Sequence, residues 1–522
     1  MLIILPAAIL SVTIIIMVVM QRRDVGRGLV WSAAAIGSTA AIIVSLFLVR
    51  ALPIELVIRS GAVSIFNRLP FTLTLDLTAW AFQTALLAIL SAVLLTATRR
   101  QASSGPGAWL GTLGIAMVGL VAVQAGTLST LLSAWFLIDT LELVVLLVSL
   151  KPSHDLGKLA TSFLLRYAGI LLALIAIIQP GDQMINNVNI YLFLAVMLRL
   201  GALPFWPYWG DTKTLTGLGT MMLAVRVTSV LVPLARLTPG SIPPQWTALL
   251  TTYCLLLMFY CAIQWLRLAA AQDRRVYWII GYGLVACMCV IHDQASSGVM
   301  WGVTALLCGS SLFLMTDRSR FYIGLPLAGL LAMTGLPYTP ISSGWSGLLG
   351  APVDWRATPF IVAHVLYLAG FLRLAFKTGE SEGKMEGLAR FAYPAGLILL
   401  LLMPWAILLA AGVETPLLDW WAGFFTFALF LVIIIIFRAQ LFEDAELKLP
   451  TSNFWKTSKK ILDRILAALQ QDWLVNLFDR FFSWVGRITT IISNILEGDG
   501  GVLWVLLLLA LFATLISGSG GI

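Results

Sequence analysis

Two carboxylates stand three residues apart inside a long apolar stretch of the sequence. Asp139 and Glu142 occur in Ser-Ala-Trp-Phe-Leu-Ile-Asp-Thr-Leu-Glu-Leu, and a spacing of three places both on one face of a helix. Arg199 and Arg226 lie in two later apolar stretches. Because buried charges need partners, we expect Arg199 to pair with Asp139 or Glu142. Carboxylates paired with cations in an apolar interior can hold or pass ions, although such a pair can also serve only to join helices.

Three further titratable residues lie inside or at the end of apolar stretches. His292 and Asp293 are adjacent, and His364 stands in a later stretch. Histidine titrates near neutrality, so each histidine could exchange protons; the alternative is a hydrogen-bonded core or interfacial residue. We expect no metal, cofactor or disulfide, because the cysteines lack paired ligand spacing. They are Cys254, Cys261, Cys287, Cys289 and Cys308.

The composition identifies the elements that must position these residues. Hydrophobic residues make up 60% of the 522 residues, charged residues only 11%, and the mean hydropathy is +0.95. This balance excludes a soluble domain and predicts an all-α polytopic membrane protein with 14–16 transmembrane helices. The apolar stretches cover residues 2–20, 28–50, 74–98, 108–126, 129–150, 160–179, 188–207, 214–237, 246–268, 276–292, 297–316, 321–340, 357–376, 390–412, 418–438 and 501–517.

The basic residues orient the chain. Lys and Arg collect in every second loop, which places those loops in the cytoplasm and the N-terminus outside. The formal charge of +8 is therefore a topology signal, and we expect a lipid bilayer and no nucleic acid as a partner. We interpret the first stretch as a membrane helix, since it lacks the basic start and cleavage site of a signal peptide. The cytoplasmic set is Arg22, Arg23, Arg27, Arg99, Arg100, Lys151, Lys158, Lys213, Arg274, Arg275, Arg318, Arg320, Lys377, Lys384 and Arg390.

Prolines interrupt two of the stretches in corresponding places. Pro204 and Pro207 fall in the seventh stretch, and Pro337 and Pro340 fall five stretches later. If stretches four to eight and nine to thirteen are equivalent, their odd number makes the second copy inverted, with a broken helix fourth in each. Inverted repeats with broken helices build ion sites in many transporters. The alternative is two unrelated kinks, since proline is common in membrane helices.

Near the C-terminus, the long apolar stretches give way to a segment in which apolar and charged residues alternate. Apolar residues recur three and four apart over 452–496, which predicts an amphipathic helix about 65 Å long if continuous. It either crosses neighbouring subunits or rests on lipid headgroups, on the cytoplasmic side. We therefore divide the chain into N-terminal helices, two five-helix repeats, additional helices, the amphipathic lateral helix and a terminal anchor: 1–107, 108–237, 246–376, 390–438, 452–496 and 501–517.

Several motifs, taken in order, resemble one family: the antiporter-like, proton-conducting membrane subunits of respiratory complex I, membrane-bound hydrogenases and Mrp-type cation/proton antiporters. Glu142 resembles the glutamate of the family's fifth helix, and the C-terminal segment resembles the lateral helix of some members. The other matching motifs are Leu-Thr-Leu-Asp76, Arg199-x-Gly-Ala-x-Pro204 with Asp211, Asp273-Arg274-Arg275 and Gly335-Leu336-Pro337.

The chain differs from the family pattern at the positions where the family carries basic side chains. Arg199 occupies the lysine position of the seventh helix, and arginine cannot be deprotonated in a protein, so it could bias Glu142 but not relay a proton. Met222 stands at the usual histidine or lysine position of the eighth helix. The second half carries no titratable amine near Cys308 and Gly309 or near Gly344 and Trp345.

The resemblance implies a proton- or cation-translocating subunit in the cell (inner) membrane of a prokaryote. Its partners would be other integral membrane subunits of a respiratory or antiporter complex. Any redox chemistry, of the NADH-quinone oxidoreductase or hydrogenase kind, would sit on those partners, because the chain carries no nucleotide, flavin or metal fingerprint. Two alternatives stay open: a non-conducting structural subunit with the same fold, and a stand-alone secondary transporter.

Overall fold

The computed structural model describes residues 2–58, 71–97, 105–149, 156–178, 184–207, 216–237, 240, 242–267, 271–315, 324–349, 357–376, 389–412 and 420–442. The chain divides into two compact units, Met1–Pro450 and Thr451–Ile522. The predicted lateral helix (452–496) and terminal anchor (501–517) lie outside the described residues, as does Asp211.

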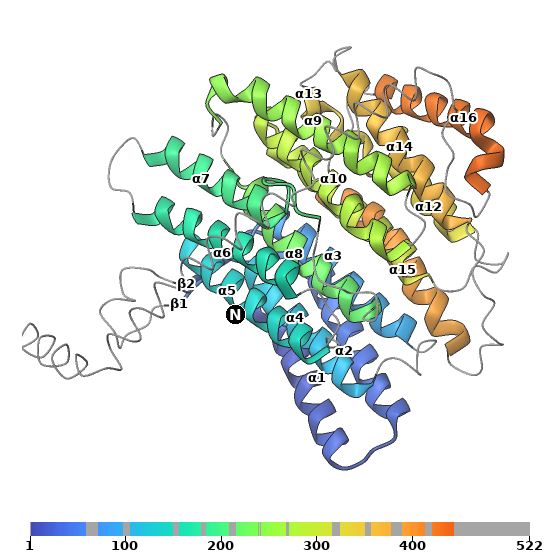
Figure 1. Ribbon diagram of the computed structural model, residues 1–522. Helices are drawn as coiled ribbons and strands as arrows, with labels where there is room; N and C mark the ends of the chain where they lie inside the picture. Colours follow the sequence, from blue (N-terminus) through green and yellow to red (C-terminus); the bar gives the residue numbers. More distant parts are fainter. Residues whose placement is uncertain are drawn as a thin grey trace, which may run out of the picture. The chain divides into compact units, whose positions relative to one another are not determined.

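Helices dominate the described part of the first unit (Figure 1). Ten are long and apolar enough to cross a membrane, and five shorter apolar helices accompany them. The prediction of an all-α polytopic membrane protein is therefore confirmed for this part of the chain. The helices are α1 (Leu5–Arg22), α2 (Arg27–Leu48), α3 (Leu77–Thr96), α4 (Pro106–Val123), α5 (Leu128–Ser149), α6 (Leu156–Ile178), α7 (Met184–Arg199), α8 (Thr216–Ala235), α9 (Pro244–Arg267), α10 (Ala271–Ile291), α11 (Ala295–Leu314), α12 (Gly324–Met333), α13 (Ser346–Leu349), α14 (Thr358–Ala375), α15 (Ala389–Ala411) and α16 (Trp420–Phe442).

A small antiparallel sheet accompanies the helices, and the sequence analysis missed it. Strands β1 (Ile54–Ile58) and β2 (Phe71–Leu75) pair with Ile54 opposite Leu75. The Phe-Thr-Leu-Thr-Leu alternation of β2 is the signal that could have revealed it. Asp76 follows directly, caps α3 by accepting from Ala79 N at 2.7 Å, and pairs with Arg236 Nε at 2.9 Å. Arg236 thereby ties the end of α8 to the sheet.

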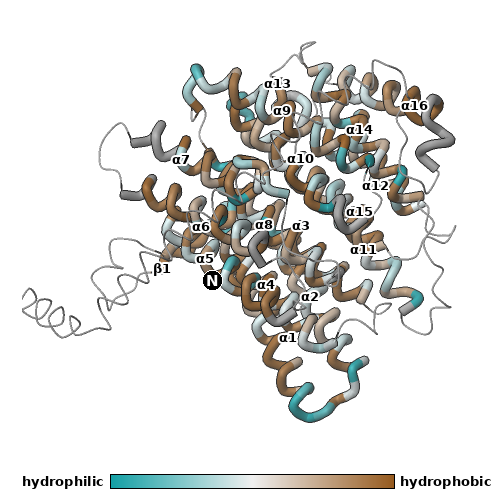
Figure 2. Tube along the Cα trace, viewed as in Figure 1, coloured by the Kyte–Doolittle hydropathy of each residue, from teal (hydrophilic) through white to brown (hydrophobic). Residues whose placement is uncertain are grey.

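The centre of the unit consists of helices that are buried all round. Every residue of α3 from Ala79 to Leu94 is buried, and so is every residue of α11 from Ser297 to Leu314. Helices that are apolar on every face suit such a position. The outer helices expose apolar side chains such as Ile36 and Leu409. Along the Cα trace in Figure 2, most of α1 is coloured hydrophobic and the turn between α1 and α2 is coloured hydrophilic. An apolar outer surface is what lipid contact requires.

The two predicted repeats show matching helix contacts. In the first, α4 packs against α8; in the second, α9 packs against α14. The fourth helix ends early in both, α7 at Arg199 and α12 at Met333. The two five-helix repeats, at 108–237 and 246–376, and their inverted relation stay predictions.

Both interrupted helices end two residues before a glycine with positive φ, and before the prolines. After α7, Gly201 adopts φ +71°, and the amides of Gly201 and Ala202 close the helix on the carbonyls of Leu198 (3.0 Å) and Met197 (2.9 Å). After α12, Gly335 adopts φ +76°. Glycine takes this left-handed conformation without a Cβ penalty. The prolines, Pro204 and Pro207 after α7 and Pro337 and Pro340 after α12, lie beyond these glycines and keep the chain from resuming a helix at once.

Candidate functional site

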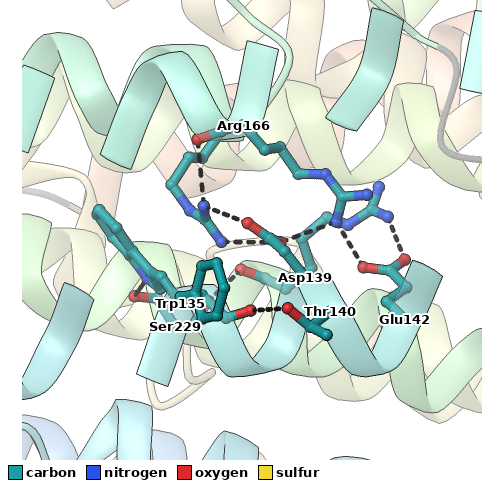
Figure 3. A network of polar contacts seen from close by, with 9 residues as sticks. Trp135, Asp139, Thr140, Glu142, Arg166 and Ser229 are labelled. Atoms are coloured by element: carbon teal, nitrogen blue, oxygen red, sulfur yellow. Dashed lines mark hydrogen bonds and ion pairs between the residues drawn. The ribbon is translucent and has the colours of Figure 1, made fainter. Parts of the chain in front are cut away.

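Helix α5 carries both carboxylates of the candidate site into the protein interior. Asp139 is 0% exposed and Glu142 is 3% exposed. Their spacing of three residues places them on one face, and Figure 3 shows both side chains pointing toward Arg166. Ionised groups at this depth must be paired, so the contacts that they make define the site.

Arg199, the last residue of α7, pairs with Asp139. Arg199 Nη1 lies 2.7 Å from Asp139 Oδ2, and Nη2 lies 3.2 Å from Oδ1, which is a two-point contact between guanidinium and carboxylate. The guanidinium also lies over the ring of Trp135, with Cζ 4.4 Å from the ring centroid. Of the two carboxylates that the sequence offered as its partner, the structure selects Asp139.

Arg166 on α6 joins the two carboxylates, and the sequence analysis overlooked it. Its Nη1 lies 3.1 Å from Asp139 Oδ1 and 2.5 Å from Glu142 Oε2. Its Cζ lies 3.9 Å above the ring of Phe163. The signal was present in the sequence, because Arg166 is a charge in the middle of the sixth apolar stretch.

Arg226 on α8 completes the network by an ion pair with the Oε1 atom of Glu142. The five charged side chains therefore come from four consecutive helices, α5 to α8, and each is at most 3% exposed. We call Asp139, Glu142, Arg166, Arg199 and Arg226 the charge network. It adjoins the point at which α7 is interrupted, because Arg199 is the last helical residue there.

Helices α6 and α7 approach each other closely beside the charge network, at Gly169. A Cβ atom added to Gly169 on α6 would lie 2.9 Å from Arg199 Cγ and 3.1 Å from the carbonyl oxygen of Ala195. Glycine at this position therefore lets α6 and α7 approach until Arg199 Nη1 also reaches the carbonyl of Arg166, at 3.4 Å. The position of the arginine is fixed by packing as well as by charge.

His364 lies in the second half of the unit, where no hydrogen bond or ion pair among the described residues links it to the charge network. Its Nε2 is 2.7 Å from the carbonyl oxygen of Met333, the last residue of α12, and its Nδ1 is 3.0 Å from the Tyr282 hydroxyl. A carbonyl only accepts, so Nε2 carries the proton and Nδ1 accepts from Tyr282. His364 thus satisfies a carbonyl that the interruption of α12 would leave without a partner.

Aromatic residues fill the space around His364. The ring centroids of Trp301 and Trp345 lie 5.1 and 5.7 Å from the His364 ring, in edge-on orientation. Trp301 Nε1 donates to the carbonyl of Gly344 at 2.8 Å. Gly344 and Trp345, where the sequence lacks an expected titratable group, contribute to this packing through their contacts with Trp301. Gly309, near the other such place, lies against Trp278.

His292 and Asp293 occupy the turn between α10 and α11, at a helix end. Asp293 is exposed, and its Oδ1 accepts from the Gly240 amide at 2.7 Å. His292 Nε2 lies 3.4 Å from the Thr251 hydroxyl. Burial lowers the pKa of His292, and Asp293 partly opposes this effect. The predicted ion-pathway residues therefore fall into three separate places: the charge network, the His364 cluster and this turn.

Comparison with solved structures identifies the fold. A chain of the Mrp complex from Dietzia sp. DQ12-45-1b is similar to the whole chain at 16% identity, with a TM-score of 0.70, and the chain spans 63% of its length. A chain of the archaeal membrane-bound sulfane sulfur reductase matches at 10% identity and TM-score 0.67, with 99% of each covered. A chain of respiratory complex I from Thermus thermophilus matches at 16% identity and TM-score 0.60, over 82% of this chain and 99% of that one.

No protein-family model matches the sequence, and no curated protein matches it either. At these low identities, what the solved structures share with the chain is the fold. The predicted likeness is thus confirmed at the level of the fold, which the chain shares with chains of an Mrp complex, a membrane-bound sulfane sulfur reductase and respiratory complex I.

Proposed function

We propose that the chain is an antiporter-like membrane subunit of a multisubunit complex and takes part in proton or cation translocation. The observation that carries this proposal is the charge network, which gathers five ionised side chains in the interior beside the interruption of α7. Charged groups at membrane depth are costly, and they mark ion pathways in many membrane proteins. The shared fold with Mrp and complex I chains supports the same assignment.

The carboxylates are the groups of the network that can take up and release a proton or hold a cation. The three guanidiniums keep their charge and act as fixed electrostatic partners. At an effective dielectric constant of 20, two unit charges 4 Å apart interact by ~4 kcal/mol. Neutralising Glu142 would therefore release Arg166 and Arg226 from a strong attraction and favour their movement. Arg166 also contacts Asp139, which pairs with Arg199 at the end of α7, so this contact would couple ion binding to the interruption of α7.

We further propose that the chain lies in a prokaryotic cell membrane, and the alternation of Lys and Arg between the loops supports an N-terminus on the outside. The exposed turn between α1 and α2, which carries Arg22 and Arg23, then faces the cytoplasm. The partners would be other integral membrane subunits of a redox-driven or Mrp-type complex. The pathway would run through the repeat at 108–237, whose interruption adjoins the network, while the repeat at 246–376 contains the aromatic cluster around His364.

A second candidate, a non-conducting structural subunit of such a complex, is favoured by one observation. All three cations of the network are arginines, and arginine cannot relay a proton. In this reading the network only fixes α5 to α8 against one another. The two candidates differ in whether neutralising Glu142 changes ion transfer or only stability.

Native purification tests the assembly. A tagged chain would be purified from its own membrane, and the proteins that accompany it would be identified by mass. Redox subunits or Mrp-type subunits would support the proposal and name the complex. A chain that purifies alone, and that transports a solute when reconstituted, would contradict it and favour a stand-alone transporter.

Substitution of Glu142 tests the translocation. In an assembled complex, Glu142→Gln should reduce ion transfer at least tenfold, because the amide cannot bind a proton or a cation as the carboxylate does. Thr140→Val, which changes a neighbouring side chain bonded only to the Phe136 carbonyl at 2.8 Å, serves as the matched control. Normal transfer by correctly assembled Glu142→Gln protein would exclude the conducting role and leave the structural one.

A further inference from the structure

Trp135 on α5 contacts two other helices of the charge network. It lies four residues before Asp139, which places the two side chains on one face of α5. The indole is fully buried, and its Nε1 donates to the carbonyl oxygen of Ser229 on α8 at 3.0 Å (Figure 3). This bond restrains the orientation of the ring, whose face lies against the Arg199 guanidinium of α7, with Cζ 4.4 Å from the ring centroid. The indole therefore joins α5, α7 and α8.

These contacts hold the guanidinium of Arg199 at one end of the carboxylate pair. Side chains on one helix face stand one above the other, so Trp135, Asp139 and Glu142 follow one another in this order along α5. A guanidinium that rests on Trp135 and binds Asp139 is therefore displaced away from Glu142. The other two arginines of the charge network bind Glu142 instead.

Attraction between opposite charges does not by itself choose between the two carboxylates. Glu142 stands only three residues from Asp139, and both are buried. The N–H donors of a guanidinium suit either carboxylate equally well. A cation over the face of a desolvated tryptophan, by contrast, is favoured by a factor of roughly 30. The contact with the indole is therefore strong enough to decide which carboxylate Arg199 holds.

We propose that Trp135 is a positioning residue, which holds Arg199 on Asp139 and keeps this third guanidinium away from Glu142. Tryptophan suits the role because it offers both an aromatic face for the cation and an N–H for the Ser229 carbonyl. Loss of the indole would let Arg199 approach Glu142 and change the pH at which that carboxylate takes up a proton. Where it concerns ion transfer, this inference rests on the proposed function; the contact between indole and guanidinium does not.

Ion transfer by reconstituted complexes, measured as a function of pH, tests the positioning. Trp135→Leu should shift the midpoint of the pH profile by about half a pH unit or more, because a third cation then acts on Glu142. In protein that also carries Asp139→Leu and Arg199→Met, the same substitution should leave the midpoint of that background unchanged, since Arg199 is then absent. An equal shift in both backgrounds, or no shift in the wild-type background, would overturn the proposal.

Two further substitutions separate positioning from packing. Trp135→Phe keeps an aromatic face but loses the donor to Ser229, so it should shift the midpoint less than Trp135→Leu does. Trp80→Leu is the matched control, because Trp80 is an equally buried indole whose Nε1 donates to the Ser45 carbonyl, at 2.8 Å. It should lower stability and leave the midpoint unchanged. A shift by Trp80→Leu as large as that by Trp135→Leu would assign the effect to lost packing and overturn the positioning role.

Unfolding gives a readout that needs no ion transfer, and it decides wherever a variant transfers no ions. The unfolding equilibrium constant would be measured for a double-mutant cycle of Trp135→Leu and Arg199→Met. Trp135→Leu should raise this constant at least about tenfold more in the wild type than in Arg199→Met protein. Additive effects would overturn the inference even if the complex conducts. Coupled effects in a complex that transfers no ions would contradict the proposed function and still support Trp135 as the residue that holds Arg199.

Discussion

Arg199 holds Asp139 through both of its terminal nitrogens, at 2.7 and 3.2 Å, in a place where neither side chain reaches solvent. A buried pair of this kind strongly opposes the removal of one partner, because the other charge is then left in an apolar environment. The pair also fixes the end of α7 against α5. It therefore links the interruption of α7 to the helix that carries both carboxylates.

The first prediction concerns the contribution of the Asp139–Arg199 pair to the free energy of unfolding of the protein. Asp139→Asn should lower the free energy of unfolding by about 3–5 kcal/mol, because Arg199 is left without its carboxylate. Asp139→Leu combined with Arg199→Met should recover most of that loss, since both charges are removed together. Denaturant unfolding of the purified variants measures both values. A loss for the double variant equal to the sum of the losses for Asp139→Leu alone and Arg199→Met alone would show that the two residues are not coupled.

The second prediction concerns Arg199→Lys. Lysine restores an amine that can lose its proton but cannot reproduce the two-point contact with Asp139. We expect a loss of about 1.5–3 kcal/mol in stability, the size of one charge-assisted hydrogen bond. In a conducting subunit, the same change should alter the pH dependence of ion transfer, measured in reconstituted vesicles. An unchanged pH profile in folded protein would indicate that position 199 only holds the helices together.

The third prediction concerns the glycine that lets α6 approach α7. Gly169→Ala should destabilise the protein by about 1–3 kcal/mol, because the added Cβ would lie 2.9 Å from Arg199 Cγ and 3.1 Å from the Ala195 carbonyl. Gly114→Ala on α4 is the matched control, since a Cβ there meets no atom within 4 Å. The control should gain about 0.5–1 kcal/mol from the lower entropy of the unfolded chain. Similar effects of the two changes in unfolding experiments would contradict the close approach.

The fourth prediction concerns His364 as the partner of the Met333 carbonyl. His364→Phe removes the donor and should cost about 1–3 kcal/mol, because a buried carbonyl loses its hydrogen bond. His364→Gln keeps an N–H donor and should cost less. Unfolding measurements on both variants test this order. If His364→Phe were as stable as the wild type, the bond to α12 would have no structural role.

The fifth prediction concerns pH and His292. Burial lowers the pKa of His292 below its ordinary value of 6.5, so the unfolded chain binds more protons than the folded one between the two values. The His292 contribution to stability is therefore complete above pH 6.5 and is lost as the pH falls through the folded pKa. Wild-type Tm should decline faster than that of His292→Gln on acidification below pH 6.5. Parallel Tm curves for the two proteins would refute this effect.

Much of the fold could be predicted from the sequence because it depends on local composition. Apolar stretches of about 20 residues predicted most described membrane helices, whereas the short α13, the 3-10 helix Ser342–Gly344 and the β1–β2 sheet were not predicted. The interruptions of α7 and α12 were predicted from prolines, whereas the helices end earlier, at Arg199 and Met333, each two residues before a glycine with positive φ. Proline marks the region that cannot be helical, and glycine decides the residue at which the helix closes.

The candidate site shows what the sequence by itself determined and what only the tertiary structure decided. Asp139, Glu142, Arg199 and Arg226 could be identified as interior charges because the cost of placing a charge in an apolar stretch is a local property. The pairing could not, since Arg199 had two possible partners and the contribution of Arg166 depends on how α6 packs against α5 and α7. The sequence determines which residues must find partners, and the packing of helices distant along the chain decides which partners they find.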